Sequence, residues 1–133
     1  MAMTEHPHSV LVQKAYAAFT RGDMDALAGL LSADAAHHSP GDHPLAGHYK
    51  GRDEIIGYYR RLTEETDGSM RVQLRQVLVD GRGHAMSLHH LTAERGGEYL
   101  DQPGGIVFRI VGDRITDVDE CVADLDATNR FWS

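Results

Sequence analysis

The chain has 133 residues, enough for one compact domain, and its 13 basic and 20 acidic residues give a formal net charge of −7. This acidic balance argues against binding to a nucleic-acid backbone, which requires a basic surface. No apolar run approaches the roughly 18 residues of a membrane span, and the first residues lack the basic and apolar regions of a signal peptide. We therefore expect a cytoplasmic enzyme or small-molecule binding protein, without a nucleic-acid or membrane partner.

Two residue counts bear on the chemistry. The single cysteine, Cys121, excludes an internal disulfide bond and any metal site built from several cysteines. Histidine, in contrast, occurs nine times, and it is the side chain whose ordinary pKa lies nearest neutrality. Internal histidines are therefore candidates for acid–base chemistry or metal binding, with solvent-exposed imidazoles as the alternative for any one of them.

The first half of the chain has the apolar spacing of helices. Over residues 9–19, apolar side chains recur three and four positions apart, which predicts a first helix. Asp23 follows a glycine and is placed to cap a second helix. A loop rich in proline and glycine covers residues 40–47, and a third helix is predicted over residues 51–67.

The second half alternates apolar and polar residues, which is typical of strands. After a short first strand, we predict strands joined by glycine-containing turns over residues 71–78, 84–93, 98–111 and 114–124. In the strand 71–78, one face would carry Val72, Leu74, Gln76 and Leu78. A proline and two glycines at residues 102–105 predict a bulge or a sheet edge. Helices followed by an antiparallel meander predict an α+β fold with the helices on one sheet face.

The alternation places one acidic residue on an apolar face. In the last strand Val118, Glu120 and Val122 share a face, whereas Asp117 and Asp119 lie on the other. A carboxylate between two valines is desolvated, so we expect a raised pKa for Glu120 and a role in proton transfer. An ion pair with an arginine, or a position at the rim, is the structural alternative.

Periodicity leaves other candidate side chains undecided. Adjacent strand residues face opposite ways, so the helices are faced either by Ser87, His89 and Leu91 or by Met86, Leu88 and His90. His37 and Ser39 share one face of the short first strand over residues 35–39, and His38 lies on the other. Tyr59 lies on the apolar face of the third helix, either as a core residue or as a hydrogen-bond donor in a pocket.

Four stretches together resemble the SnoaL-like branch of the nuclear transport factor 2-like superfamily. They are residues 16–27 (YAAFTRGDMDAL), 39–41 (SPG), 44–55 (PLAGHYKGRDEI) and 107–115 (VFRIVGDRI). The resemblance implies a single domain over residues 1–133, with residues 1–7 flexible. It also implies a curved mixed or antiparallel sheet wrapped round three N-terminal helices into a cone, with a deep apolar pocket and a homodimer contact through the outer sheet face. Members include ketosteroid isomerases, polyketide cyclases, epoxide hydrolases, dehydratases and binding domains, so the family alone does not fix the activity.

The resemblance also indicates which standard catalytic groups are replaced. The positions of the two ketosteroid isomerase carboxylates hold Ser39 and Ile106, and Ile106 also stands at the carboxylate position of the SnoaL-type cyclases. The first-helix tyrosine of those isomerases falls nearest Ala15, beside Tyr16, and their third-helix tyrosine corresponds to Tyr59. We therefore do not expect a steroid isomerase of the usual type.

The matched register turns a set of side chains into the implied pocket. The polar groups that converge there are His37, Tyr59, His89 and Glu120. The substrate would also contact residues that share the same inner surface, namely Tyr16, Phe19, Ser39, Ser87, Leu91, Ile106, Phe108, Val118 and Val122. Met86, Leu88 and His90 remain on the outer face, where we expect a second subunit.

Three functions fit these residues. The first is an enzyme that moves protons on a hydrophobic, polyketide- or terpenoid-like substrate, as an isomerase, cyclase, dehydratase or epoxide-opening hydrolase. Glu120 would be its acid or base and His89 or His37 the partner, while Tyr59 would donate to a developing oxyanion. The second is a non-catalytic protein that binds an apolar metabolite. The third, a metal site, is disfavoured because His37 and His38 point to opposite faces, and no cofactor is expected.

Overall fold

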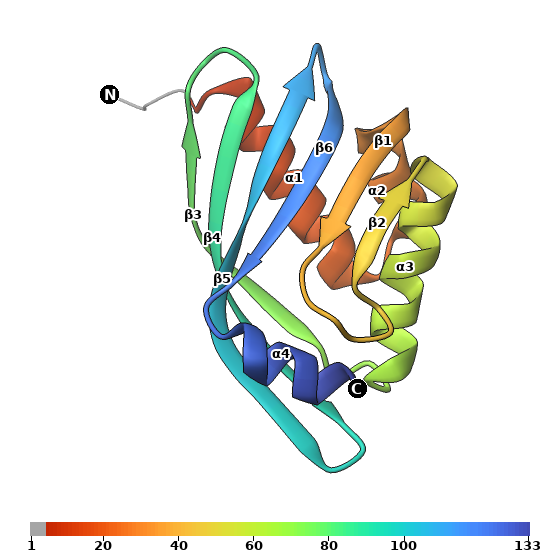
Figure 1. Cartoon of the computed structure of the whole chain (residues 1–133). Helices are drawn as coiled ribbons and strands as arrows, with labels where there is room; N and C mark the ends of the chain where they lie inside the picture. Colours follow the sequence, from red (N-terminus) through yellow and green to blue (C-terminus); the bar gives the residue numbers. More distant parts are fainter. Residues whose placement is uncertain (1–4) are drawn as a thin grey trace.

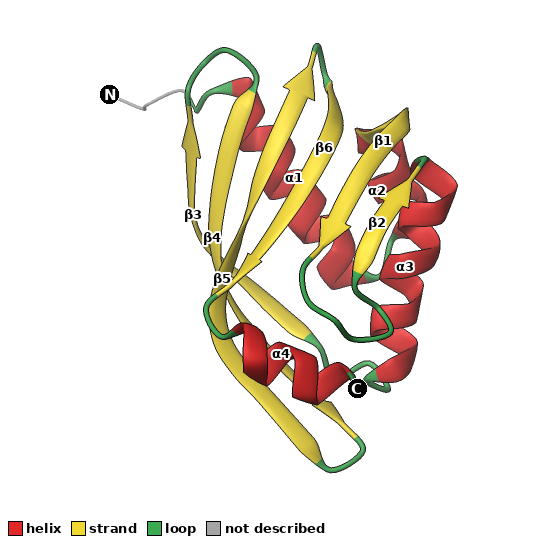
Figure 2. Cartoon of the chain, in the orientation of Figure 1, coloured by secondary structure: helices red, strands yellow, loops and turns green. Residues whose placement is uncertain are grey.

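A computed structural model describes residues 5–133 as a curved six-stranded sheet with helices against its concave face (Figures 1 and 2). In chain order the elements are α1 (Pro7–Arg21), α2 (Met24–Leu30), β1 (Leu31–Ser39), β2 (Gly47–Lys50), α3 (Arg52–Glu65), β3 (Arg71–Val79), β4 (His84–Arg95), β5 (Glu98–Val111), β6 (Arg114–Val122) and α4 (Leu125–Trp132). Residues 1–4, part of the segment expected to be flexible, lie outside the described residues. Within the described ones, no helix is both long and apolar enough to cross a membrane.

Local side chains set the helix ends. Pro7 stands in the first turn of α1, where the missing N–H has no intrahelical partner to lose. Gly22 ends α1 in the left-handed conformation, with φ at 72°. Asp23 then caps α2 by accepting a hydrogen bond from the backbone N–H of Ala26 at 3.1 Å. The predicted cap is therefore confirmed.

The strands form one sheet in the order β2-β1-β6-β5-β4-β3. The strands from β3 to β6 pair antiparallel, as the alternation predicted, but β1 runs parallel to β6, so the sheet is mixed. In that parallel pair His37 lies opposite Val118, two residues before Glu120. Since residues two apart on a strand share a face, the pairing places His37 and Glu120 side by side although they are 83 positions apart in the chain.

Helices α1 and α3 cover the concave face of the sheet (Figure 1). Val12, Ala15 and Tyr16 form the buried stripe of α1, and α3 buries residues at the same spacing, including both Tyr58 and Tyr59. Burial of this apolar area, at roughly 25 cal/mol per Å², is the main force that holds the helices against the sheet. The two tyrosines of α3 therefore face the inside of the fold together.

Two elements were not predicted from the sequence. Strand β2 has only four residues, too few for an alternating pattern to be recognised. Helix α4 follows because β6 ends at Val122 and not at residue 124. Asp124 caps the new helix by accepting from the backbone N–H of Ala127 at 3.0 Å. A fourth, C-terminal helix therefore joins the three that were expected.

The predicted face of β3 is wrong beyond its midpoint. The register with β4 shifts between Leu74 and Gln76, which leaves Arg75 as an extra residue in the strand. A bulge of this kind reverses the direction of the side chains that follow it. Leu78 consequently lies on the outer face, where it is 47% exposed.

Residues 102–105 were predicted to form a bulge or a sheet edge, and the structure has no bulge there but an edge on the β6 side at Pro103. This stretch pairs with β4 in an unbroken register, and the shift on β5 instead lies between Arg109 and Ile110, opposite β6. Pro103 is tolerated because the pairing of β5 with β6 extends only as far as Gly104, so Pro103 has no strand partner on that side for the N–H that proline lacks.

Candidate active site

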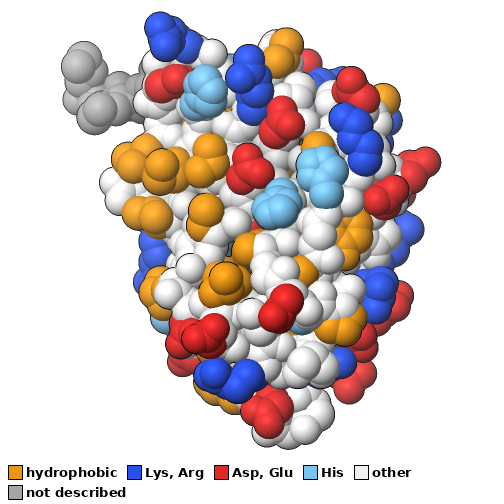
Figure 3. Space-filling model, in the orientation of Figure 1, with side chains coloured by type: hydrophobic (Ala, Val, Ile, Leu, Met, Phe, Trp, Pro, Cys, Tyr) orange, Lys and Arg blue, Asp and Glu red, His pale blue; other side chains and the backbone are white. Residues whose placement is uncertain are grey.

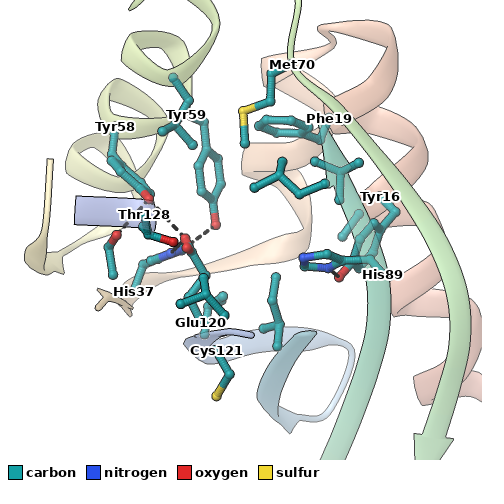
Figure 4. Close-up of a pocket in the computed structure, with 18 of the residues that line it drawn as sticks. Tyr16, Phe19, His37, Tyr58, Tyr59, Met70, His89, Glu120, Cys121 and Thr128 are labelled. Carbon is teal, nitrogen blue, oxygen red and sulfur yellow. Dashed lines mark hydrogen bonds and ion pairs between the residues drawn. The ribbon is translucent and has the colours of Figure 1, made fainter. Parts of the chain in front are cut away.

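A cavity of about 110 Å³ lies between the concave sheet face and helices α1, α3 and α4 (Figure 4). The expected site residues that line it are Tyr16, Phe19, His37, Ser39, Tyr59, His89, Leu91, Ile106, Phe108, Val118, Glu120 and Val122. Ser87 differs, because it is fully buried behind Tyr16 and does not reach the cavity wall. Core cavities of about 150 Å³ hold a benzene molecule, so this volume is somewhat smaller than the space that one ring occupies.

One wall carries the Glu120 cluster, which we define as Glu120, His37, Ser39, Tyr58 and Tyr59 (Figure 4). Oxygen Oε1 of Glu120 lies 2.7 Å from His37 Nε2 and 2.9 Å from the Tyr58 hydroxyl. His37 Nδ1 lies 2.8 Å from the Tyr59 hydroxyl, and the Tyr58 hydroxyl lies 3.0 Å from Ser39 Oγ. Strands β1 and β6 and helix α3 contribute these groups, so the cluster exists only in the complete fold.

Counting donors and acceptors assigns the protons of the Glu120 cluster. Tyr58 has one hydroxyl proton, which goes to the carboxylate, so Ser39 donates to Tyr58. The Tyr59 hydroxyl lies 2.8 Å from His37 Nδ1 and has no other hydrogen-bond partner among residues 5–133. His37 Nε2 faces the carboxylate and donates its proton to Glu120 Oε1, because a carboxylate oxygen can only accept.

The second carboxylate oxygen of Glu120 is left free. No hydrogen bond to Oε2 occurs within the described part of the chain, and the Glu120 side chain is 23% exposed where it lines the cavity. An oxygen without a partner, on a carboxylate whose other oxygen is fixed by two donors, is available to accept a proton from a bound molecule.

The expected rise in the pKa of Glu120 is wrong in direction. Burial does raise the pKa of the carboxyl, but the hydrogen bonds from His37 and Tyr58 outweigh burial and hold the pKa below its ordinary value. Burial and the negative charge of Glu120 raise the pKa values of Tyr58 and Tyr59. At neutral pH the cluster therefore holds a carboxylate and two protonated tyrosines.

The facing wall carries His89 and Tyr16 (Figure 4), which together with the buried Ser87 form what we define as the His89 cluster. The Tyr16 hydroxyl lies 2.6 Å from His89 Nδ1 and 2.6 Å from Ser87 Oγ. Tyr16 is the one hydrogen-bond partner of the Ser87 hydroxyl in the described chain, so Ser87 donates to Tyr16 and Tyr16 donates to Nδ1. Burial lowers the pKa of His89, so the imidazole is neutral and carries its proton on Nε2.

The Nε2 atom of His89 faces space that a glycine leaves open. A Cβ atom at Gly104 would stand 3.0 Å from His89 Nε2 and 2.9 Å from the carbonyl oxygen of Cys121. No partner for Nε2 lies within the residues that the structure describes. Gly104, which the sequence suggested only as a bulge residue, therefore makes room for the imidazole ring.

Sequence reasoning did not select ten of the residues that line the cavity, and three of these are Tyr58, Trp132 and His43. Tyr58 was not selected because only its neighbour Tyr59 matched the family pattern, although a stripe as wide as that of α3 could have indicated both. Trp132 belongs to the unpredicted helix α4. His43 lines the cavity from the loop after β1, where its Nδ1 accepts from the Leu45 N–H at 3.1 Å and burial lowers its pKa.

The remaining histidine of β1 faces away from the cavity. His38 is exposed on the outer sheet face, opposite His48 of β2 and Asp119 of β6. Across residues 5–133, the structure brings together no group of three or more His, Cys, Asp or Glu side chains suited to hold a metal ion.

The chain belongs to the SnoaL-like domain family, whose model matches residues 12–118. An uncharacterized protein of Mycobacterium tuberculosis is 36% identical over 131 residues, which cover 98% of this chain and all of that protein. Among solved structures, Bal32a from a soil-derived mobile gene cassette is 38% identical, with a TM-score of 0.93 over 96% of this chain and 97% of that one. An NTF2-like protein from Burkholderia pseudomallei shares the fold at 20% identity, with a TM-score of 0.85 over 97% of this chain and 99% of that one.

Proposed function

We propose that the protein is an enzyme that moves a proton on a small hydrophobic molecule, with Glu120 as the general base. The observation that carries this proposal is the free Oε2 atom of a carboxylate whose Oε1 is fixed by His37 and Tyr58. The cavity around it is largely apolar, and positioned polar groups in an apolar pocket are the usual form of a small-molecule site.

The low pKa of Glu120 limits the protons that it can remove. A weak base needs an acidified C–H bond, such as one next to a carbonyl group. Oε2 would take that proton as the C–H bond breaks, and the bond electrons would pass to the carbonyl oxygen as an enolate. The Nε2–H of His89 would donate a hydrogen bond to this oxyanion. Return of the same proton to a different carbon completes an isomerisation without any net gain or loss of atoms.

The other polar residues act as positioning groups in this mechanism. Tyr58 and His37 orient the carboxylate through Oε1, and the Tyr59 hydroxyl contacts His37 Nδ1. In this proposal Tyr59 acts through His37, whereas the sequence had suggested it as the oxyanion donor. Tyr16 fixes the proton of His89 on Nε2.

The first test measures exchange of the α-protons of a ring ketone, cyclohexanone, for deuterium in D₂O by NMR. The protein should accelerate the exchange, and Glu120→Gln should reduce the acceleration by about 10²- to 10⁴-fold. Asp119→Asn is the matched control, since it makes the same change of charge one residue away on the outer face. Equal exchange by wild type and Glu120→Gln would remove Glu120 from the mechanism.

A non-catalytic binding protein is the second candidate function. It is favoured by Ile106, which lines the cavity at a position where the related cyclases and isomerases carry a carboxylate. Binding can be followed by the fluorescence of Trp132, the single tryptophan of the chain, which lines the cavity. Saturable binding of cyclohexanone without any exchange above the solvent rate would favour this function.

We also propose that the outer sheet face packs against a second copy of the chain. Leu78, Met86 and Leu88 are 47%, 44% and 43% exposed, and Met86 pairs with both Leu78 and Val107 across the sheet. Figure 3 shows these hydrophobic side chains gathered over β3 to β5. An apolar patch on one sheet face suits the self-complementary contact of a two-fold dimer.

Light scattering after size exclusion tests the proposed dimer. Met86→Lys should convert the dimer to a monomer, because it places a charge in the centre of the patch. Val111→Lys is the control, since Val111 is 61% exposed at the end of β5. A wild-type chain that elutes with the mass of a monomer would overturn the proposal.

A further inference from the structure

The cavity wall has an unusual balance of charge. Among residues 5–133, neither lysine nor arginine lines the cavity. Burial lowers the pKa values of His89 and His43, so both are neutral at pH 7. Both nitrogens of His37 are occupied, one by Glu120 and the other by Tyr59. Glu120 is the one carboxylate of the described wall, and its Oε2 is unpaired and faces the cavity.

An unpaired carboxylate in an apolar cavity selects ligands by their charge. A second anion beside Oε2 would meet a like charge with little water to screen it. A cation would instead form an ion pair with Oε2, and the rings of Tyr16, Phe19 and Tyr59 around the same space (Figure 4) would add cation–π attraction.

The proton transfer itself sets the same limit on the substrate. With a neutral substrate the cavity carries one negative charge throughout, because that charge moves from Glu120 to the substrate oxygen as the proton moves the other way. With an anionic substrate the cavity would hold two negative charges before and after the transfer, and the described wall has neither a lysine nor an arginine to offset the second one.

We infer that the cavity takes uncharged ring compounds as substrates, binds cationic amines of the same shape as inhibitors, and excludes carboxylates. This inference rests on the proposed function for its substrates, but the order of binding follows from the wall alone. A compound with one ring would fill the cavity, whose volume is about 110 Å³, and extend in part out of it.

Three probes with one shape and three charges test the inference at pH 7. They are cyclohexylmethylamine, cyclohexylmethanol and cyclohexanecarboxylate, whose binding can be followed by Trp132 fluorescence or by calorimetry. We expect the amine to bind at least about tenfold more tightly than the alcohol, a difference that corresponds to one buried ion pair. The carboxylate should bind at least about tenfold more weakly than the alcohol.

Glu120→Gln identifies the source of this order. The amide is neutral and close in shape, so the amine should lose its advantage while the affinity for the alcohol changes less than about threefold. Asp119→Asn, the control on the outer face, should keep the wild-type order. In the exchange assay with cyclohexanone, the amine should inhibit competitively.

Several outcomes would overturn the inference. They are equal affinities for the carboxylate and the alcohol, an amine preference that survives in Glu120→Gln, and no saturable binding of any probe. Because these measurements need no turnover, they fail separately from the proposed function. The expected binding order without proton exchange would keep the charge selectivity and leave only the catalytic proposal wrong.

Discussion

The two polar clusters of the cavity contain the same series of hydrogen bonds, which ends on a different group in each. In each, a serine hydroxyl donates to a tyrosine, and the tyrosine donates to the group that faces the cavity: Ser39 to Tyr58 to Glu120 on one wall, Ser87 to Tyr16 to His89 on the other. In the Glu120 cluster this series of hydrogen bonds ends on an anion. His37, which also contacts Tyr59, provides a second hydrogen bond to that anion. In the His89 cluster the series ends on a neutral ring.

The difference shows how the same hydrogen bonds can fix either a charge or a proton position. Two donors to one carboxylate oxygen hold Glu120 ionised despite its burial. One donor to a ring nitrogen does not charge the imidazole, whose pKa burial lowers, but it fixes the proton on the far nitrogen. In the proposed mechanism the first cluster is therefore the base and the second the donor, which separates the two roles across the cavity.

The largest expected effect comes from breaking the Glu120 cluster at its branch. His37→Leu leaves the Glu120 carboxylate with one donor and the Tyr59 hydroxyl with no acceptor, so the free energy of unfolding should fall by about 3 kcal/mol. Urea denaturation measures this loss. In the double variant His37→Leu with Glu120→Leu, no unpaired carboxylate remains, and at least half of the loss should return. A double variant that loses the sum of the two single losses would contradict this account.

A smaller effect is expected from the corresponding change in the His89 cluster. Tyr16→Phe removes the donor to His89 and the acceptor of Ser87, so stability should fall by about 1–2 kcal/mol. Catalysed exchange should fall by about tenfold, because the proton of His89 is no longer confined to Nε2. Tyr99→Phe, at a tyrosine that is 59% exposed, is the control and should change neither quantity. If Tyr16→Phe kept full activity, a role for Tyr16 in setting the tautomer would be untenable.

The smallest effect separates the two clusters by pH. Burial lowers the pKa of His89, so as the pH falls below the ordinary 6.5 the unfolded chain gains a proton that the folded protein does not. Its contribution to stability is present above 6.5 and is lost below that value. Glu120 has a lowered pKa as well, so its contribution is present above the ordinary 4.5 and is lost as the pH falls through the folded-state pKa.

Stability measured in urea across a pH series checks this assignment. His89→Gln should flatten the profile just below pH 6.5, and Glu120→Gln should flatten it below pH 4.5. Outer-face Asp119→Asn serves as the reference for the loss of one exposed carboxylate. Finding the two flattened regions exchanged would show that the pKa directions are assigned to the wrong groups.

Local pattern was sufficient for the orientation of one strand near the site. Alternation alone placed Glu120 on the apolar face of β6. Alternation left both faces of β4 open, and only the family resemblance turned His89 inward, where it is 9% exposed. The face of β3 could not be predicted in the same way, because the extra residue Arg75 reverses the alternation without leaving a glycine or proline as a sign.

The direction of the Glu120 pKa shift could not be predicted from the sequence, because it depends on contacts between distant parts of the chain. The sequence argument assigned Glu120 a raised pKa because it considered only the two flanking valines. The groups that reverse the sign, His37 and Tyr58, come from β1 and α3, at positions 83 and 62 residues away in the chain. Burial can be inferred from a strand's own pattern, whereas the donors that offset burial belong to other elements.

The parallel contact between β1 and β6 has a consequence for how the protein comes to be active. His37 of β1 is made early during synthesis, and Glu120 of β6 is made shortly before the last helix. A ribosome-bound chain that lacks β6 therefore has β1 and the two tyrosines of α3 without the carboxylate that they surround. Docking of the penultimate element would complete the sheet and bring the proposed base to its two donors. Helix α4 follows it and adds Trp132 to the cavity wall, so the proposed base and its enclosure are both completed by the last part of the chain.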